Sequence, residues 1–384
     1  MAAGVSGTAS TQRTTARARR WGAAALLAGV ALLGACAPAI GTLTPQQQVD
    51  QLVAFVERTR GHKFPTKPVV EFIPDATFQQ HVLDSLSAVQ PGLDKDEVAF
   101  QALGWMPTTD DLYAKYRVAF GTSVVGFYDP VTKVLEVRGS QLTAYRREVV
   151  VHELTHALDD QLFDLNESYG DGVLSEQQLS FLVAVEGDAV RSQQAWSKQA
   201  SPADQLAALS EQLSFQIDPN IFSVPIALLS ISQTPYLQGP AFVNGLGGNA
   251  GIDTMLSTRY PDTAEEAWNP AKYLADEGAA AVPTPPADGT VVNSGSWGRF
   301  NMSLVLANGV DIDASLNPVT DGWAGDAYVT WTTATQRCIR IDTRSDTPTQ
   351  AASLRAALDT WSNGHGGVTV AATDTTTTRL TSCR

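Results

Sequence analysis

The chain has 384 residues, of which 43% are hydrophobic and 17% are charged, and its formal net charge at pH 7 is −14. This apolar content is enough for a large core, and it excludes a disordered or fibrous protein. The negative charge repels nucleic acid, and the chain contains no basic stripe interleaved with aromatic residues. We therefore exclude a nucleic-acid-binding protein.

The first 35 residues are predicted to be a signal peptide rather than part of the fold. Four arginines within residues 13–20 precede an apolar run at residues 21–33, which is too short to span the hydrocarbon core of a bilayer. A positive region followed by a short apolar run is typical of an export signal. The mature chain is therefore expected outside the cytoplasm.

The apolar run ends in the sequence LGAC at residues 33–36, which resembles the bacterial lipoprotein box. In that box the cysteine, here Cys36, is lipidated and becomes the first residue of the mature protein. We expect a lipid anchor at the extracytoplasmic face of the cell membrane and a tether over residues 36–45. The alternative is an ordinary secretory signal followed by an incidental cysteine.

The chain has three cysteines. If Cys36 carries lipid, Cys338 and Cys383 remain as an even pair in an oxidising compartment. We expect a disulfide between these two residues, and two free buried thiols are the alternative.

Regular elements begin after the tether. Apolar spacing and β-rich composition predict helices over residues 48–60, 78–89 and 95–103, and a strand over residues 69–73. Residues 123–137 contain two β-rich runs joined by an Asp-Pro turn, which predicts a hairpin that can present an edge strand.

Residues 145–161 contain no glycine or proline and are apolar nearly all round, which predicts a buried helix. This helix carries the sequence HELTH at residues 152–156. Residues four apart share one helix face, so the imidazoles of His152 and His156 can bind one metal ion. Glu153 lies beside them, where it can act as a general base on a metal-bound water.

A second helix is predicted over residues 175–196, and Glu186 lies in the middle of its apolar stripe. A buried carboxylate needs a partner, because an unpaired charge costs several kcal/mol to bury. The nearest expected partner is a cation held by the two histidines, which makes Glu186 the expected third ligand. The alternative is an ion pair with an arginine of the preceding helix, such as Arg146 or Arg147.

The string HELTHAL at residues 152–158, followed by VEGDA at residues 185–189, resembles the gluzincin branch of zinc metallopeptidases and a set of actinobacterial lipoproteins. The similarity covers residues 124–189, with weaker matches at residues 269–274 and 322–326. The third-ligand sequence EGDA departs from the best-known gluzincin patterns.

This resemblance implies a Zn²⁺ cofactor with His152, His156 and Glu186 as its ligands, and a water at the fourth position. It also implies that Glu153 is the base and proton shuttle. Asp160 and Asp188 are expected to accept the remaining imidazole N–H groups, and the alternative for each is a solvated helix charge. Tyr260 and Tyr273 could stabilise an oxyanion, but nothing in the sequence positions either one.

Further helices are expected over residues 202–213 and 222–231, before a glycine-rich passage at residues 244–251 and a proline-rich one at residues 282–286. The last eighty residues predict strands at 327–332, 337–342 and 368–371 around a helix at 351–361. Residues 375–378 are expected to be a final edge strand or a frayed tail.

The expected fold is α+β and zincin-like, mostly helical with a small β-sheet or hairpin beside the motif helix. Residues 46–285 are expected to form the metallopeptidase domain, and residues 286–384 a small C-terminal α+β subdomain packed on it. The expected function is zinc-dependent hydrolysis of peptide bonds in peptide or protein substrates in the cell envelope. The alternative is a catalytically degenerate zincin-like lipoprotein that acts as a binding or scaffold protein, and retention of Glu153 favours the enzyme.

Overall fold

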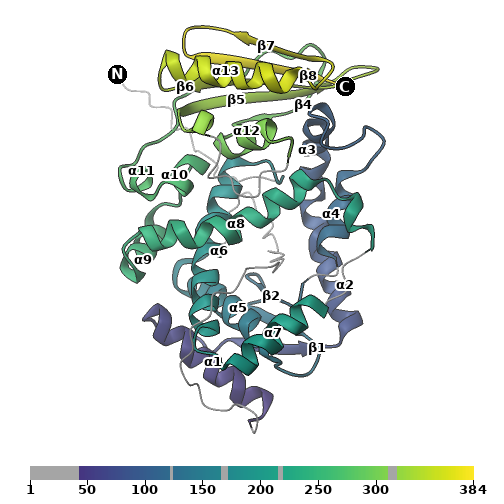
Figure 1. Ribbon diagram of the computed structural model, residues 1–384. Coiled ribbons are helices and arrows are strands. Elements are labelled where there is room, and N and C mark those ends of the chain that lie inside the picture. Colours follow the sequence, from purple (N-terminus) through teal and green to yellow (C-terminus); the bar gives the residue numbers. More distant parts are fainter. Residues whose placement is uncertain (1–42, 122–123, 166–171, 215–218, 310–317) are drawn as a thin grey trace, which may run out of the picture.

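The computed structural model describes residues 43–121, 124–165, 172–214, 219–309 and 318–384 (Figure 1). The predicted signal peptide, Cys36 and the tether up to residue 42 lie outside the described residues. The fold is mixed α+β, with helices predominating and two small sheets. Among the described helices, none combines the length and apolarity needed to cross a bilayer.

The first sheet has three strands, β1 (Val69–Ile73), β2 (Gly126–Asp129) and β3 (Val134–Arg138), in the order β1-β3-β2. β2 and β3 form the predicted hairpin, and β1 adds to β3 in parallel. The predicted strand at residues 69–73 is confirmed. β2 is therefore an edge strand, and it packs beside the helix that carries the HELTH motif.

That helix is α5 (Ala144–Phe163), which begins where the Thr143 side chain accepts a hydrogen bond from the Arg146 N–H. α5 packs against α1 (Pro45–Arg60), α6 (Glu176–Ser197) and the first sheet. Its apolar residues are buried on nearly every side, as the sequence predicts: Val149, Val150, Val151, Leu154, Ala157 and Leu158 are each at most 1% exposed.

α8 (Ile226–Gly245) crosses α6 (Figure 1) at Gly187 and Gly239. A Cβ on Gly187 would lie only 2.4 Å from the Gly239 carbonyl oxygen, so glycine is required for this close approach. The predicted helix at residues 222–231 was wrong in both limits, because α8 starts later and continues through Pro235 and Pro240. Packing against α6 offsets the roughly 3 kcal/mol by which an interior proline disfavours a helix.

The remaining helices surround this centre. They are α2 (Asp75–Leu86), α3 (Gln90–Ala102), α4 (Leu112–Phe120), α7 (Pro202–Ser214), α9 (Asn249–Thr258), α10 (Ala264–Trp268), α11 (Pro270–Leu274), α12 (Arg299–Leu306) and α13 (Pro348–Ser362), with short 3₁₀ turns at Ser87–Val89, Pro219–Ser223 and Pro318–Thr320. α9 begins inside the glycine-rich passage at residues 244–251, for which the sequence analysis predicted no helix.

The second sheet contains β4 (Thr290–Gly295), β5 (Trp323–Thr332), β6 (Arg337–Ser345), β7 (Val368–Ala372) and β8 (Thr377–Cys383), in the order β4-β5-β6-β8-β7. β8 pairs with strands on both sides. The expectation of an edge strand or frayed tail at residues 375–378 was therefore wrong. A disulfide joins Cys338 of β6 to Cys383 of β8, and these two residues are direct partners in the strand register.

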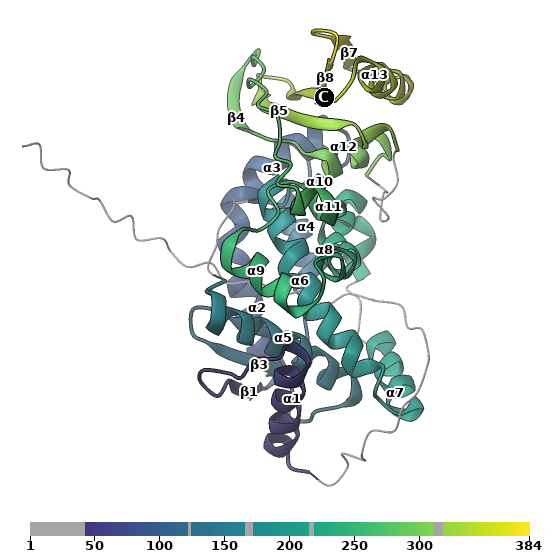
Figure 2. The ribbon, with the colours of Figure 1, turned by 90° about the vertical axis from the view of Figure 1, so that its left-hand side faces the viewer.

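The C-terminal sheet forms the upper end of the molecule in Figures 1 and 2, and it packs against the helical part. α3 contacts β4, β5 and β6, and the Ser382 hydroxyl donates to the Ala102 carbonyl at 2.6 Å. Ile339, Ile341 and Leu380 of the sheet belong to the same hydrophobic core as Phe100 of α3. The two parts therefore share one core.

Glu176, the first residue of α6, lies near this junction and is only 2% exposed. Its Oε1 accepts a hydrogen bond of 2.7 Å from the Ala264 N–H, while Oε2 has no hydrogen-bond partner among the described residues. Burial raises the pKa of Glu176 to about 8, and the nearby carboxylates of Asp326 and Glu265 add to the rise, whereas the Ala264 N–H and Arg299 oppose it. The folded protein therefore favours the neutral acid.

Because the pKa of Glu176 is higher in the folded than in the unfolded chain, the folded state binds more protons between about pH 4.5 and pH 8. The free energy of unfolding should fall as the pH rises through this window. We predict that Glu176→Gln is more stable than the parent at pH 8 by up to about 4 kcal/mol, and by much less at pH 5. Urea unfolding at both values measures this, with the exposed Glu71→Gln as control. Parallel pH profiles for parent and variant would contradict the prediction.

Candidate functional site

α5 places the two motif histidines one turn apart on the same face. The Nε2 atoms of His152 and His156 are 3.1 Å apart, and the side chain of His152 is 2% exposed while that of His156 is 12% exposed. The imidazoles therefore converge on one point between α5 and α6.

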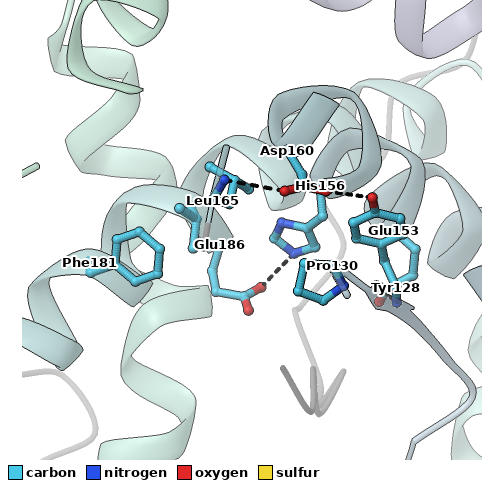
Figure 3. A pocket seen from close by; sticks show the side chains of 9 residues that line it. Tyr128, Pro130, Glu153, His156, Asp160, Leu165, Phe181 and Glu186 are labelled. Carbon is cyan, nitrogen blue, oxygen red and sulfur yellow. Dashed lines mark hydrogen bonds and ion pairs between the residues drawn. The ribbon is translucent and has the colours of Figure 1, made fainter. Parts of the chain in front are cut away.

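Glu186 reaches the same point from α6 (Figure 3). Its Oε2 lies 3.0 Å from the Nε2 of His152 and 3.4 Å from the Nε2 of His156. Burial alone would raise the pKa of Glu186, but the two imidazoles outweigh it and hold that pKa well below its ordinary value. Neither arginine considered as an alternative partner pairs with Glu186: Arg147 binds Asp204 at 2.8 Å, and Arg146 faces Glu211 at 3.8 Å.

These three side chains suit a divalent metal. Within the described residues they form the one group of three or more potential ligands whose atoms lie within 4.8 Å of one another. Ligand atoms about 2.1 Å from a tetrahedral zinc are roughly 3.4 Å apart, close to the three separations of 3.0 to 3.4 Å found here. Two histidines and one carboxylate match the ligand set of catalytic zinc sites.

The ring of His152 is oriented by a residue that the sequence reasoning missed. Its Nδ1 lies 3.2 Å from the side-chain oxygen of Gln193, so Nδ1 is the donor and Nε2 stays free for a metal. Gln193 follows Glu186 by seven residues on α6, which places both on the same helix face. That spacing was the available sequence signal.

Glu153 is oriented by the edge strand. The backbone N–H of Tyr128 donates to its Oε2 at 2.9 Å, while Oε1 has no hydrogen-bond partner among the described residues. Glu153 is 1% exposed, and burial raises its pKa to about 8; the charge of Glu186 adds to the rise, whereas His152 and the Tyr128 N–H lower it. One carboxylate oxygen is thus held in place and the other is free to exchange a proton.

A small pocket is lined by Glu153, His156 and Glu186 (Figure 3). Its volume is about 30 Å³, enough for about two water molecules. Polar and apolar side chains line it together: Tyr128, Pro130, Glu153, His156, Asp160, Leu165, Phe181, Val185 and Glu186.

Tyr236 of α8 is a further residue of the site that the sequence did not indicate. Its ring lies 6.0 Å from that of His152, nearly parallel to it, and its hydroxyl interacts electrostatically with Glu186. Burial raises the pKa of Tyr236 well above its ordinary value, and the charges of Glu186 and Glu153 raise it further. The α6–α8 crossing brings Tyr236 here. The tyrosines considered from the sequence lie elsewhere: Tyr273 donates to the Arg259 carbonyl, and Tyr260 packs against Phe181.

Comparison with known proteins adds a match in the C-terminal part only. The family model described as "Domain of unknown function (DUF8575)" matches residues 284–382, which include the second sheet and α13. No curated protein and no solved structure matches the chain. The match does not include α5 or α6, so the geometry of the site carries the functional argument.

Asp160 does not accept the hydrogen bond from an imidazole that the sequence led us to expect. Its Oδ2 accepts from the Tyr128 hydroxyl at 2.5 Å and from Lys133 at 2.7 Å. Lys133 adopts a left-handed backbone conformation, with φ of 59°, in the turn of the hairpin. Asp160 thus attaches the β2–β3 hairpin to α5, a contact that local helix spacing could not indicate.

Asp188 also differs from the expectation, because its partners are arginines. It is fully buried, with Oδ1 2.8 Å from Arg191 and Oδ2 2.5 Å from Arg60. Arg60 ends α1 and also lies 2.8 Å from Asp159, the residue three positions after His156. Burial raises the pKa of Asp159 well above its ordinary value, Arg60 opposes the rise, and Asp188 adds to it. Arg60 therefore joins the two helices that carry the site.

We predict that Arg60→Met lowers the free energy of unfolding by about 3–5 kcal/mol, because it leaves buried carboxylates without their cation. Arg60 is 0% exposed, whereas Arg58 on the same helix is exposed. Arg58→Met is the matched control and should change stability by less than about 0.5 kcal/mol. Urea unfolding of both variants measures the difference. Equal stabilities would show that the buried ion pairs contribute no net stability.

Proposed function

We propose that the protein is a gluzincin-like, zinc-dependent metallopeptidase of the cell envelope. The observation that carries this proposal is the convergence of two imidazole nitrogens and one carboxylate oxygen beside the free Oε1 of Glu153. His152, His156 and Glu186 would hold the zinc. When bound, zinc acts as a Lewis acid toward a carbonyl oxygen and makes a water molecule easier to deprotonate.

Glu153 is the proposed general base. The Tyr128 N–H fixes its Oε2, so Oε1 is the atom that accepts the proton of the attacking water and passes it to the leaving amine. Its burial supports this role, because a carboxyl with a pKa near the working pH transfers protons in both directions.

Tyr236 is the proposed donor to the oxyanion. Its hydroxyl keeps its proton at neutral pH, since its pKa is raised, and it lies next to Glu186. The tetrahedral intermediate of peptide hydrolysis carries a negative oxygen, which a neutral hydroxyl can stabilise. We propose that the substrate lies extended along β2, the edge strand from which Tyr128 orients the base.

The anchor of the protein is a second part of the proposal. Cys36, at the end of the sequence LGAC, would carry the lipid and hold the mature chain at the extracytoplasmic face of the membrane. The catalytic domain would then start after the tether, and the domain limits expected from the sequence, residues 46–285 and 286–384, are kept as part of this proposal.

The experiment that tests the function combines metal analysis with a random peptide library. We expect one zinc per chain, lost on chelation, together with cleavage of library peptides that stops on chelation and returns with zinc. Stoichiometric zinc without cleavage would instead support the degenerate binding protein. Purified protein that retains no zinc would refute the metal site itself.

A further inference from the structure

The two charged side chains of α7 contact arginines of α5, and the side chains of Asp204 and Glu211 are 46% and 20% exposed. Asp204 binds Arg147 at 2.8 Å and Glu211 faces Arg146 at 3.8 Å, and both arginines belong to α5. Ala208 packs beside these ion pairs into a small apolar cluster with Val125, Tyr145 and Val149. The charges of α7 are thus used to hold the helix against α5.

The outer face of α7 is apolar and uncharged. It carries Leu206, Leu209 and Leu213, which are 68%, 41% and 69% exposed. The other exposed positions of the helix also lack charge: Pro202, Ala203, Ala207, Ser210 and Ser214. On a chain with a net charge of −14, an exposed helix face with three leucines and no charge marks an interaction surface.

We propose that this outer face of α7 lies in the interfacial layer of a phospholipid bilayer. The start of the described chain indicates the partner. α1 begins at Pro45, and the nine residues from Cys36 to that point span at most about 30 Å. Figures 1 and 2 both place α1 and α7 at the end of the molecule opposite the C-terminal sheet. The end held near the membrane by a lipid on Cys36 is therefore the end that presents the leucines.

The composition of α7 indicates the headgroup charge of the bilayer that it would contact. The helix contains no lysine or arginine, so attraction to anionic headgroups does not contribute, and apolar burial must drive the contact. A neutral, zwitterionic phospholipid surface fits this face, and binding to it should be insensitive to salt. Since α7 packs directly on α5, the contact would hold the motif helix within one helix layer of the membrane.

The inference uses the proposed lipid anchor only for orientation, and it is independent of zinc and of catalysis. It is tested on the chain from residue 36 to 384 with Cys36→Ser, which carries no lipid. Every described element lies at or after residue 45, so this form retains all of them. The assay is co-flotation with phosphatidylcholine vesicles at millimolar lipid, which gives a partition coefficient.

We expect the protein to float with the vesicles, equally in low and high salt. Replacing Leu206 and Leu213 by serine should lower the partition coefficient at least about tenfold. The matched control replaces Leu274 and Val291, which are 66% and 56% exposed on α11 and β4, and should leave flotation unchanged. Equal thermal unfolding midpoints for both double variants would verify that the fold is intact.

The other outcomes overturn the proposal. If the protein does not float, or if both double variants lose flotation equally, the α7 face is not a membrane contact. Sedimentation in the absence of lipid examines the rival partner, a second copy of the chain. A dimer that dissociates in the Leu206 and Leu213 variant, without flotation of the parent, would assign this face to self-association.

Discussion

Glu153→Gln is expected to keep one zinc per chain and to lower the rate of peptide hydrolysis by about 10³-fold. General acid–base catalysis typically contributes between about 10² and 10⁴ to a rate. Glutamine can still accept the Tyr128 N–H through its amide oxygen, so the local structure should persist. It cannot take the proton of water, because an amide NH₂ group replaces Oε1, the oxygen that is proposed to accept this proton.

The control for this variant is Glu148→Gln on the same helix. Glu148 accepts a hydrogen bond of 2.7 Å from the Ser197 hydroxyl and lies outside the pocket, so its replacement should leave kcat and zinc content nearly unchanged. The measurement is kcat and KM on a cleaved library peptide, together with zinc analysis of both proteins. Hydrolysis by Glu153→Gln at the parent rate would reject Glu153 as the base.

The part of the site that lies on one helix could be predicted from the sequence. The i and i+4 spacing of His152 and His156 places both imidazoles on one face wherever the helix packs. Glu186 could be predicted to approach them for an energetic reason, because a carboxylate in an apolar stripe needs a compensating partner. The structure brings the three side chains together.

The supporting residues depend on contacts between distant elements, and no local pattern indicates them. Tyr236 reaches His152 because α8 continues through Pro235 and crosses α6 where Gly187 meets Gly239. Helix propensity predicts that such a segment ends at the first proline, and packing reverses that preference. Arg60 is likewise 99 residues from its partner Asp159.

The position of a strand within the C-terminal sheet also depends on contacts between distant elements. β8 is an interior strand, yet its sequence is polar, with threonine, arginine and serine on the two sides of Leu380. Leu380 and Ser382 are 0% exposed and Thr378 is 1% exposed, because β8 pairs with β6 on one side and β7 on the other. Strand preference reflects packing against neighbours more than intrinsic propensity, so the position of β8 in the sheet could not be inferred from its composition.

Glu186→Ala is expected to abolish stoichiometric zinc binding while the chain remains folded. Loss of a residue that hydrogen-bonds to a metal ligand typically weakens metal affinity 10–100-fold. Loss of a ligand itself should weaken the affinity by more than about 100-fold. Zinc content after dialysis and competition with a chromogenic chelator measure this change.

The matched control is Glu176→Ala, ten residues earlier on the same helix. Glu176 is equally buried, at 2% exposed against 5% for Glu186, but it contacts the Ala264 N–H instead of imidazoles. Its replacement changes a buried carboxylate of the same helix and should leave the zinc in place, which separates an effect on the helix from loss of a ligand. If Glu186→Ala instead retains full zinc occupancy and is only less stable, Glu186 is an ion-pair partner of His152 and His156, and the metal has a different third ligand.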